Sequence, residues 1–194
     1  MLTQEQRSNL STGLARYAIT LVSAIAIFWF LEIADWLLPG RGLDGYGIQP
    51  RTADGFRNIL FAPFLHYGFD HLIGNTIPFV VLGGLVIIRR ESDFLWVSAI
   101  SALVSGLGIW ALGFPNTVHL GVSGVIFGYM GYLLLRGYFE RSILSIVIAL
   151  FAGFLYGGML FGLIMPFRPG ISWLGHFFGF VGGGLAAYWM VKDE

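Results

Sequence analysis

Cysteine is absent from the 194-residue chain, which excludes disulfide bonds, thiolate metal sites and a cysteine nucleophile. Charge is also scarce, because charged residues make up 11% of the sequence, whereas a soluble domain carries about a quarter. The formal net charge is zero, so no nucleic-acid partner is predicted. Together with a mean hydropathy of +0.76, this scarcity of charge predicts a protein that lies in a lipid bilayer.

Motifs that would indicate other functions are missing as well. No H-E-x-x-H string occurs, and the spacing of His66 and His71 does not suit one helix face, so we predict no metal site, no metalloprotease and no cofactor. The first apolar run extends from near Tyr17 to about Leu38, which is too long for the core of a cleavable signal peptide. We therefore expect this run to remain as a transmembrane helix.

Long apolar runs are abundant, and a run of about 20 residues is enough to cross a bilayer. Six such runs cover residues 15–38, 69–88, 94–113, 120–138, 143–165 and 172–191. We expect an all-α membrane protein in which six transmembrane helices form a bundle. Residues 1–14 are expected to be a short cytoplasmic N-terminal tail, and residues 15–194 one domain. The glycine-rich segment 39–68 is expected to be a folded loop at the membrane surface.

Arginine and lysine predict the orientation of this bundle. With six spans, one side of the membrane holds Arg7, Arg16, Arg89, Arg90, Arg136, Arg141 and Lys192, and the other holds Arg41, Arg51, Arg57 and Arg168. Because cytoplasmic loops carry the excess of basic residues, both termini are expected in the cytoplasm. The 39–68 loop then lies outside.

A first cluster of polar residues lies at the start of the second span. His71 and Asn75 are four residues apart and therefore share one helix face. Strongly polar side chains within a span are costly and often functional. The alternative is that His71 is an ordinary interfacial residue and that Asn75 caps or bridges helices.

A second cluster, Gly121-Val-Ser123-Gly124, opens the fourth span. A serine in the first turn of a helix lies among backbone N–H groups without intrahelical acceptors, at the positive end of the helix dipole. That position favours a serine alkoxide and supplies donors for an oxyanion. The alternative is an ordinary serine beside glycines that only pack helices.

The third cluster surrounds His176 in the early part of the sixth span. Gly175, Gly179 and Gly183 form a stripe of small residues, and Gly124 and Gly128 form another in the fourth span. Such stripes let helix axes approach closely, which would bring His176 within hydrogen-bond reach of Ser123. All three polar clusters lie in the first turns of spans that run from outside to inside, so we expect them at one depth.

This order of motifs resembles the rhomboid family over nearly the whole chain: H-x-x-x-N in the second span, G-x-S-G opening the fourth, and G-H-x-x-G in the sixth. The resemblance implies a rhomboid-type bundle that cleaves transmembrane proteins. It makes Ser123 the nucleophile and His176 the general base of a dyad without an acid. His71, Asn75 and the Ser123 N–H would then bind the oxyanion.

Further residues match the family's pattern less closely. Phe127 stands where a tyrosine commonly stacks on the catalytic histidine, and His66 matches a histidine of family members. Phe56-Arg57 resembles the aromatic-arginine pair of the first loop, but Gly55 stands where an acidic residue often precedes it. His119 adds a polar group close to the serine motif.

Two other functions remain open from the sequence. A small transporter would also use polar groups within the membrane and helices broken by glycine. A non-catalytic rhomboid-like protein would bind membrane proteins without cleaving them, although such proteins typically lack the serine or the histidine. The function we predict is an intramembrane serine endopeptidase that acts on transmembrane proteins in the outer half of a prokaryotic cell membrane, with the lipid bilayer itself as its other partner.

Overall fold

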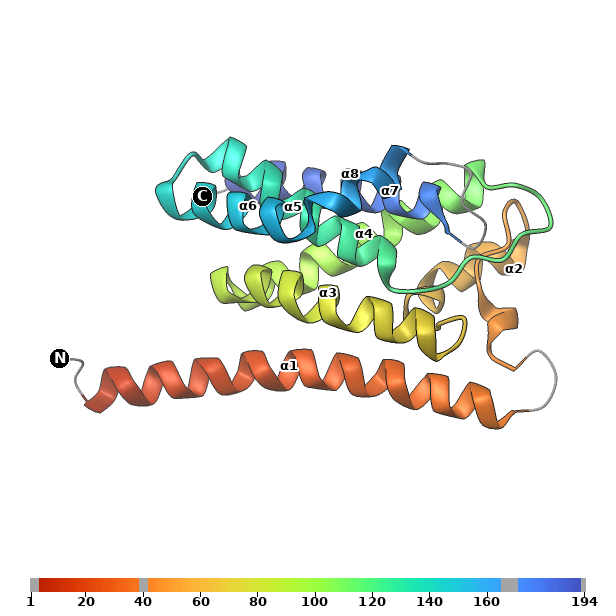
Figure 1. The fold of residues 1–194 in the computed structure, drawn as a ribbon, viewed down its shortest axis with the longest axis horizontal. Helices are drawn as coiled ribbons and strands as arrows, with labels where there is room; N and C mark the ends of the chain where they lie inside the picture. Colours follow the sequence, from red (N-terminus) through yellow and green to blue (C-terminus); the bar gives the residue numbers. More distant parts are fainter. Residues whose placement is uncertain (1–3, 39–41, 165–170, 193–194) are drawn as a thin grey trace.

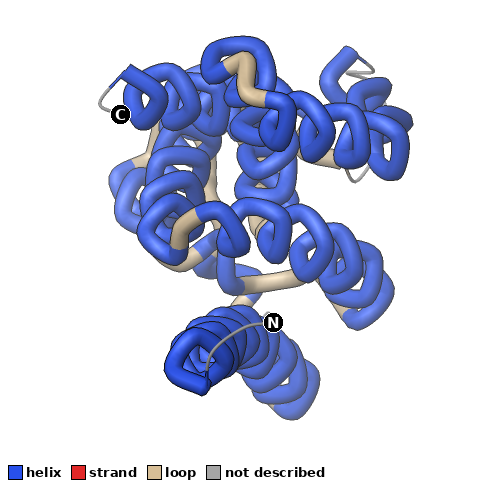
Figure 2. The backbone as a smooth tube through the Cα atoms, turned by 90° about the vertical axis from the view of Figure 1, so that its left-hand side faces the viewer, coloured by secondary structure: helices blue, strands red, loops and turns tan. Residues whose placement is uncertain are grey.

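A computed structural model of the chain describes residues 4–38, 42–164 and 171–192, and these residues form a bundle of helices (Figure 1). The long helices are α1 (Gln4–Leu37), α3 (Phe69–Arg89), α4 (Glu91–Leu112), α5 (Ser123–Glu140), α6 (Ile143–Tyr156) and α8 (Trp173–Lys192). The short ones are η1 (Asp44–Tyr46), α2 (Ala53–Arg57), η2 (Asn58–Leu60), η3 (Ala62–Phe64), η4 (Gly157–Leu160) and α7 (Phe161–Ile164). The predicted all-α membrane bundle is confirmed. In the view along the long axis of the bundle, α1 lies at the periphery (Figure 2).

Among the described residues, five helical segments are long and apolar enough to cross a membrane: Ala15–Leu37 of α1, Phe69–Ile88 of α3, Ser92–Leu112 of α4, Ile143–Leu160 of α6 and η4 together, and Trp173–Lys192 of α8. They correspond to five of the six predicted spans. The helix α1 begins at Gln4, so the part of the predicted tail that the structure describes continues the first span as helix. Residues 1–3 of that tail, residue 165 of the fifth span and Arg168 lie outside the described residues.

The remaining predicted span, the fourth, corresponds to α5, which is less apolar than the five segments named above and contains Arg136 and Glu140. Every residue from Gly124 to Leu133 is buried, since α3, α4, α6 and α8 all pack against this helix. Protein rather than lipid therefore surrounds most of α5. At about 1.5 Å per residue, its 18 residues are still long enough to cross most of a hydrocarbon core.

Glycines bring α5 and α8 into backbone contact. A Cβ atom placed on Gly179 would overlap the carbonyl oxygen of Gly124, and one on Gly183 would overlap that of Gly128. Only helices without side chains at these positions can approach so closely. The predicted small-residue stripes therefore meet, and they fix the distance between the two helices.

The opposite end of α5 is held by a buried ion pair. Arg136 Nη1 lies 3.2 Å from Asp93 Oδ2 of α4, and both side chains are almost fully buried. The Tyr132 hydroxyl donates to the same carboxylate oxygen at 2.6 Å, and Arg136 Nε lies 2.7 Å from Glu140 Oε2. This end lies near the two chain termini, which are together at one end of the bundle, away from α2 (Figure 1).

Candidate active site

Ser123 is the first residue of α5, where the backbone N–H groups have no acceptor within the helix. The turn that delivers it depends on Gly121, whose φ of 118° is a conformation that residues with a side chain rarely adopt. The Gly121 N–H donates to the carbonyl of Ala62 at 2.9 Å, which ties this turn to the first loop. The serine hydroxyl is therefore held at the positive end of a buried helix.

His176 is the fourth residue of α8, and its Nε2 lies 3.0 Å from Ser123 Oγ. The two residues are 53 positions apart in the sequence, and the contact of α5 with α8 brings them together. The Phe127 ring, one turn after Ser123, lies flat against the His176 imidazole, with ring centroids 4.1 Å apart and an interplanar angle of 12°. This stacking holds the imidazole in the orientation that faces the serine.

His71 is the third residue of α3 and lines the same cavity as Ser123. The backbone N–H of Tyr67 lies 3.3 Å from His71 Nδ1 and donates to it. Because Nδ1 accepts this hydrogen bond, the proton of a neutral imidazole lies on Nε2, which is left as a donor. The imidazole packs directly against the backbone of Gly121, at a place where a Cβ atom would not fit.

Asn75 follows His71 by one turn of α3 and is almost fully buried. Its Nδ2 donates one hydrogen bond to the carbonyl of His71 at 3.0 Å, which fixes the side-chain amide and leaves the second N–H of that group available. The side chain therefore presents a donor from a rigid position on the same helix face as His71.

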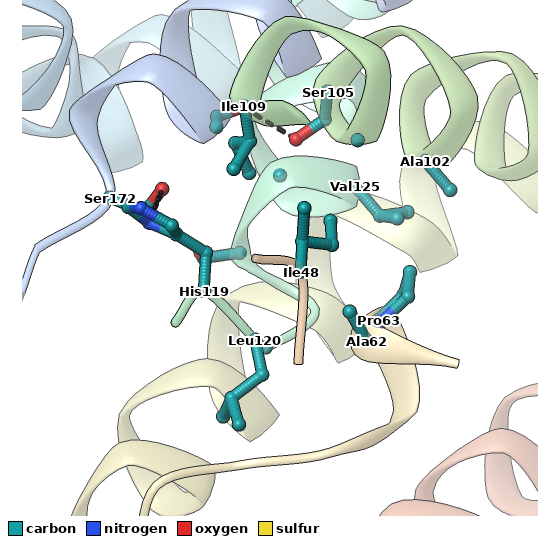
Figure 3. A pocket seen from close by; sticks show the side chains of 15 residues that line it. Ile48, Ala62, Pro63, Ala102, Ser105, Ile109, His119, Leu120, Val125 and Ser172 are labelled. Carbon is teal, nitrogen blue, oxygen red and sulfur yellow. Dashed lines mark hydrogen bonds between the residues drawn. The ribbon is translucent and has the colours of Figure 1, made fainter. Parts of the chain in front are cut away.

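A cavity of about 1100 Å³ connects these groups. Its lining includes His71, Asn75, Ser123, Phe127, His176 and His119. A second, small cavity of about 20 Å³ is also lined by Ser123, and the Ser105 hydroxyl at its edge donates to the carbonyl of Gly175 at 2.9 Å (Figure 3). A volume of this size is enough for about one water molecule. The large cavity can admit an extended peptide segment together with water.

His66 packs against His71. The side chain is 2% exposed, and its ring contacts the His71 ring edge to face, with centroids 5.4 Å apart. Burial first and the neighbouring His71 second together lower the pKa of His66 to about 3, so His66 is neutral near pH 7. Among the residues that the structure describes, no three His, Asp or Glu side chains converge on a site that could hold a metal ion.

The Rhomboid domain family matches residues 53–193, which extend from α2 to the end of α8. The chain belongs to the rhomboid family. An uncharacterized protein of Mycobacterium tuberculosis is 40% identical over 182 residues, which cover 90% of this chain and 75% of that protein. An uncharacterized protein of Mycobacterium leprae is 38% identical over 186 residues, 91% of this chain and 72% of that one. The rhomboid protease GlpG of Pectobacterium atrosepticum is 29% identical over 174 residues, 87% of this chain and 60% of GlpG.

One residue assigned by resemblance to the rhomboid family lies away from the others. Arg57 is exposed, forms a 3.5 Å ion pair with Asp54 and lines neither cavity. At Gly55, where the family often has an acidic residue, a Cβ atom would overlap the backbone of Gln49, so this loop path leaves no room for a side chain. Other bonds anchor this loop: Arg51 Nη2 donates to the Gly113 carbonyl at 3.0 Å, and Trp110 Nε1 donates to the Thr52 carbonyl at 2.8 Å.

The structure also places two serines of α4, which the motifs in the sequence did not indicate, against the glycines of α5. Ser105 and Ser101 are buried, and their hydroxyls lie where a Cβ atom on Gly124 or Gly128 would be. They are four residues apart, so a third stripe of small residues was visible in the sequence. The α5 glycines therefore accommodate α4 as well as α8.

Proposed function

We propose that this protein is an intramembrane serine protease in which Ser123 is the nucleophile and His176 the general base. The observation that carries the proposal is the 3.0 Å approach of His176 Nε2 to Ser123 Oγ within the large cavity. A hydroxyl within hydrogen-bond reach of an imidazole is the geometry that activates a serine. The membership of the chain in the rhomboid family supports the same assignment.

The reaction proceeds by two transfers of an acyl group. His176 Nε2 takes the proton of Ser123 Oγ as this oxygen attacks the peptide carbonyl, and it then gives the proton to the leaving amine. A water molecule attacks the resulting ester, with His176 again taking a proton, and the serine hydroxyl is restored. The Phe127 ring favours the imidazolium formed in each step, because the face of an aromatic ring attracts positive charge.

Three donors near Ser123 are available to bind the negative charge that develops. They are the Nε2–H of His71, the free N–H of the Asn75 amide and the backbone N–H of Ser123 at the start of α5. Donors that are fixed before the reaction stabilise an oxyanion without reorganisation, and removing one typically costs about 3 kcal/mol of transition-state binding.

The substrates are transmembrane proteins, and both termini of the enzyme lie in the cytoplasm. The termini are together at one end of the bundle, and the positive-inside rule assigns that end to the cytoplasm (Figure 1). The site lies near the other end and therefore opens toward the outer face. Because a helical substrate encloses its carbonyls in its own hydrogen bonds, we expect cleavage where small or helix-breaking residues permit unwinding.

The proposal is tested by labelling the purified protein with a fluorophosphonate in detergent and by measuring cleavage of a reporter transmembrane substrate. We expect the wild type to be labelled, and Ser123→Ala and His176→Ala each to lose cleavage. The double variant should be no worse than either single variant, because the two residues act as one unit. Ser98→Ala, which removes a 2.7 Å contact with Tyr129 outside both cavities, is the matched control. Cleavage that survives Ser123→Ala contradicts the proposal.

A further inference from the structure

His119 joins two loops at the outer end of the bundle. It lies between α4 and α5, and its backbone forms an isolated antiparallel bridge with Ile48 of the first loop. The Ile48 N–H donates to the His119 carbonyl at 2.7 Å, and the His119 N–H donates to the Ile48 carbonyl at 3.0 Å. The backbone of His119 is thus fixed, and its half-buried side chain extends along the wall of both cavities.

The imidazole of His119 lies in a chain of hydrogen bonds whose directions can be derived. The Thr117 hydroxyl donates to the carbonyl of Phe114 at 2.6 Å, so its oxygen acts as acceptor toward His119 Nε2 at 2.9 Å. The ring proton therefore lies on Nε2. In the neutral imidazole Nδ1 is then the acceptor, and it receives the hydroxyl proton of Ser172 at 2.9 Å. Burial lowers the pKa of His119 below its usual value, which keeps the imidazole neutral near pH 7.

Ser172 is the residue immediately before α8, and its carbonyl accepts the backbone N–H of His176 at 3.1 Å. Figure 3 shows His119 and Ser172 side by side at one edge of the small cavity. The bond between them joins two segments that lead into helices. His119 lies four residues before Ser123, in the segment that leads into α5, and Ser172 lies four residues before His176, in the segment that leads into α8. This hydrogen bond therefore connects the two chain segments that carry the reacting groups.

We propose that His119 is a positioning residue, which through Ser172 holds the N-termini of α5 and α8 in the register that Ser123 and His176 require. This inference rests on the proposed function of that pair. The glycine contacts between α5 and α8 set the separation of the two helices along their length, but these glycines follow Ser123 and His176 in the two helices. The bond from His119 to Ser172 joins the segments that precede the two helices. Loss of this bond lets the first turn of α8 shift, and a displacement of about 1 Å at a reacting group can cost on the order of 100-fold in rate.

The test compares His119→Leu, His119→Asn and Ser172→Ala in the full-length protein in detergent, with the fluorophosphonate labelling rate, kcat, KM and Tm as readouts. We expect His119→Leu and Ser172→Ala to lower the labelling rate and kcat by about 10- to 100-fold, with KM changed less than about twofold. The double variant should be no slower than His119→Leu alone. Asparagine places its Oδ1 near the position of Nδ1 and can accept the Ser172 hydroxyl, so His119→Asn should recover most of the rate.

Two controls separate this inference from a loss of general stability and from the proposed function. Ser98→Ala removes a hydrogen bond between α4 and α5 in the core and should keep the wild-type labelling rate, whatever its effect on Tm. Wild-type rates in Ser172→Ala, or His119→Asn as slow as His119→Leu, would overturn the positioning role while leaving Ser123 as nucleophile. Equal labelling of the wild type and Ser123→Ala would instead overturn the proposed function.

Discussion

The rings of Phe127 and His176 are stacked face to face, with centroids 4.1 Å apart and planes inclined by 12°. Phe127→Leu keeps an apolar side chain but removes this face, so the imidazole can rotate away from Ser123 and its charged form loses a favourable contact. We expect kcat to fall about 10-fold, from the combined loss of orientation and of the cation–π attraction. Phe127→Tyr keeps the ring and should stay within about threefold of the wild type. Equal rates for the leucine and tyrosine variants would show that the ring has no part in turnover.

His71 and Asn75 should affect turnover more than binding, because an oxyanion exists only in the transition state and the intermediates. We expect His71→Ala and Asn75→Ala to lower kcat by about 10- to 1000-fold, with a smaller change in KM. Thr76→Val is the matched control, since the Thr76 hydroxyl donates to the carbonyl of Leu72 in its own helix at 2.8 Å, and Thr76 lines neither cavity. Steady-state kinetics on a reporter substrate provides the measurement. A wild-type kcat in both alanine variants would make this face of α3 structural.

The glycine contact between α5 and α8 should tolerate no side chain. We expect Gly179→Ala to lower kcat on the order of 100-fold, because its methyl group would overlap the Gly124 carbonyl and push the two helices apart. In Gly84→Ala the new methyl group lies 3.9 Å from the nearest atom, a Leu21 methyl, so this variant should retain activity.

Gly83 is unsuitable as a control for that experiment. A Cβ atom at this position would lie 3.1 Å from Phe94 and 3.2 Å from Tyr129, which is already crowded. The informative comparison is therefore kcat for Gly179→Ala against Gly84→Ala, with Tm recorded for each. Full activity in Gly179→Ala would separate the helix contact from the geometry of the site.

The membrane bundle and the candidate residues could be predicted from the sequence, because the length of an apolar run and the four-residue spacing of a small-residue stripe can both be recognised there. It selected Ser123, His176, His71 and Asn75, and the structure brings all of them to one cavity. Their catalytic roles remain predictions.

Other features had no such signal in the sequence. The hydrogen bond between His119 and Ser172 joins two loop residues that are 53 positions apart in the sequence. Loops have no periodicity that indicates which way a side chain points. The exposed position of Arg57 depends on the path of the first loop, which is fixed by distant bonds such as the one from Arg51 to the end of α4.

Acid should destabilise the protein in part through His66. Its pKa is about 3 in the folded state, because of burial first and the nearby His71 second, against an ordinary value of 6.5. Below pH 6.5 the unfolded chain binds a proton that the folded protein does not, so the free energy of unfolding decreases as the pH falls from about 6.5 toward 3. Above about pH 6.5 this loss of stability is absent. Between the two pKa values, the free energy of unfolding changes by at most about 1.4 kcal/mol per pH unit through His66.

The matching experiment records Tm in detergent between pH 7.5 and pH 4.5 for the wild type and for His66→Phe, which suits a site lined by Phe28. We expect the wild type to lose more stability over this range than the variant. Parallel curves would mean that His66 is not a significant source of the pH dependence.

The enclosure of α5 has a consequence for biosynthesis. Among the long helices that the structure describes, α5 alone belongs to none of the segments that are apolar enough to cross a membrane, and its most extensive contacts are with α8, which is made later. We expect α5 to wait in or beside the translocon, retained by its neighbours, until the 20 residues of α8 arrive and cover it. Ser123 then meets His176 only when the last helix is inserted, so the proposed dyad cannot form in a nascent chain that still lacks α8.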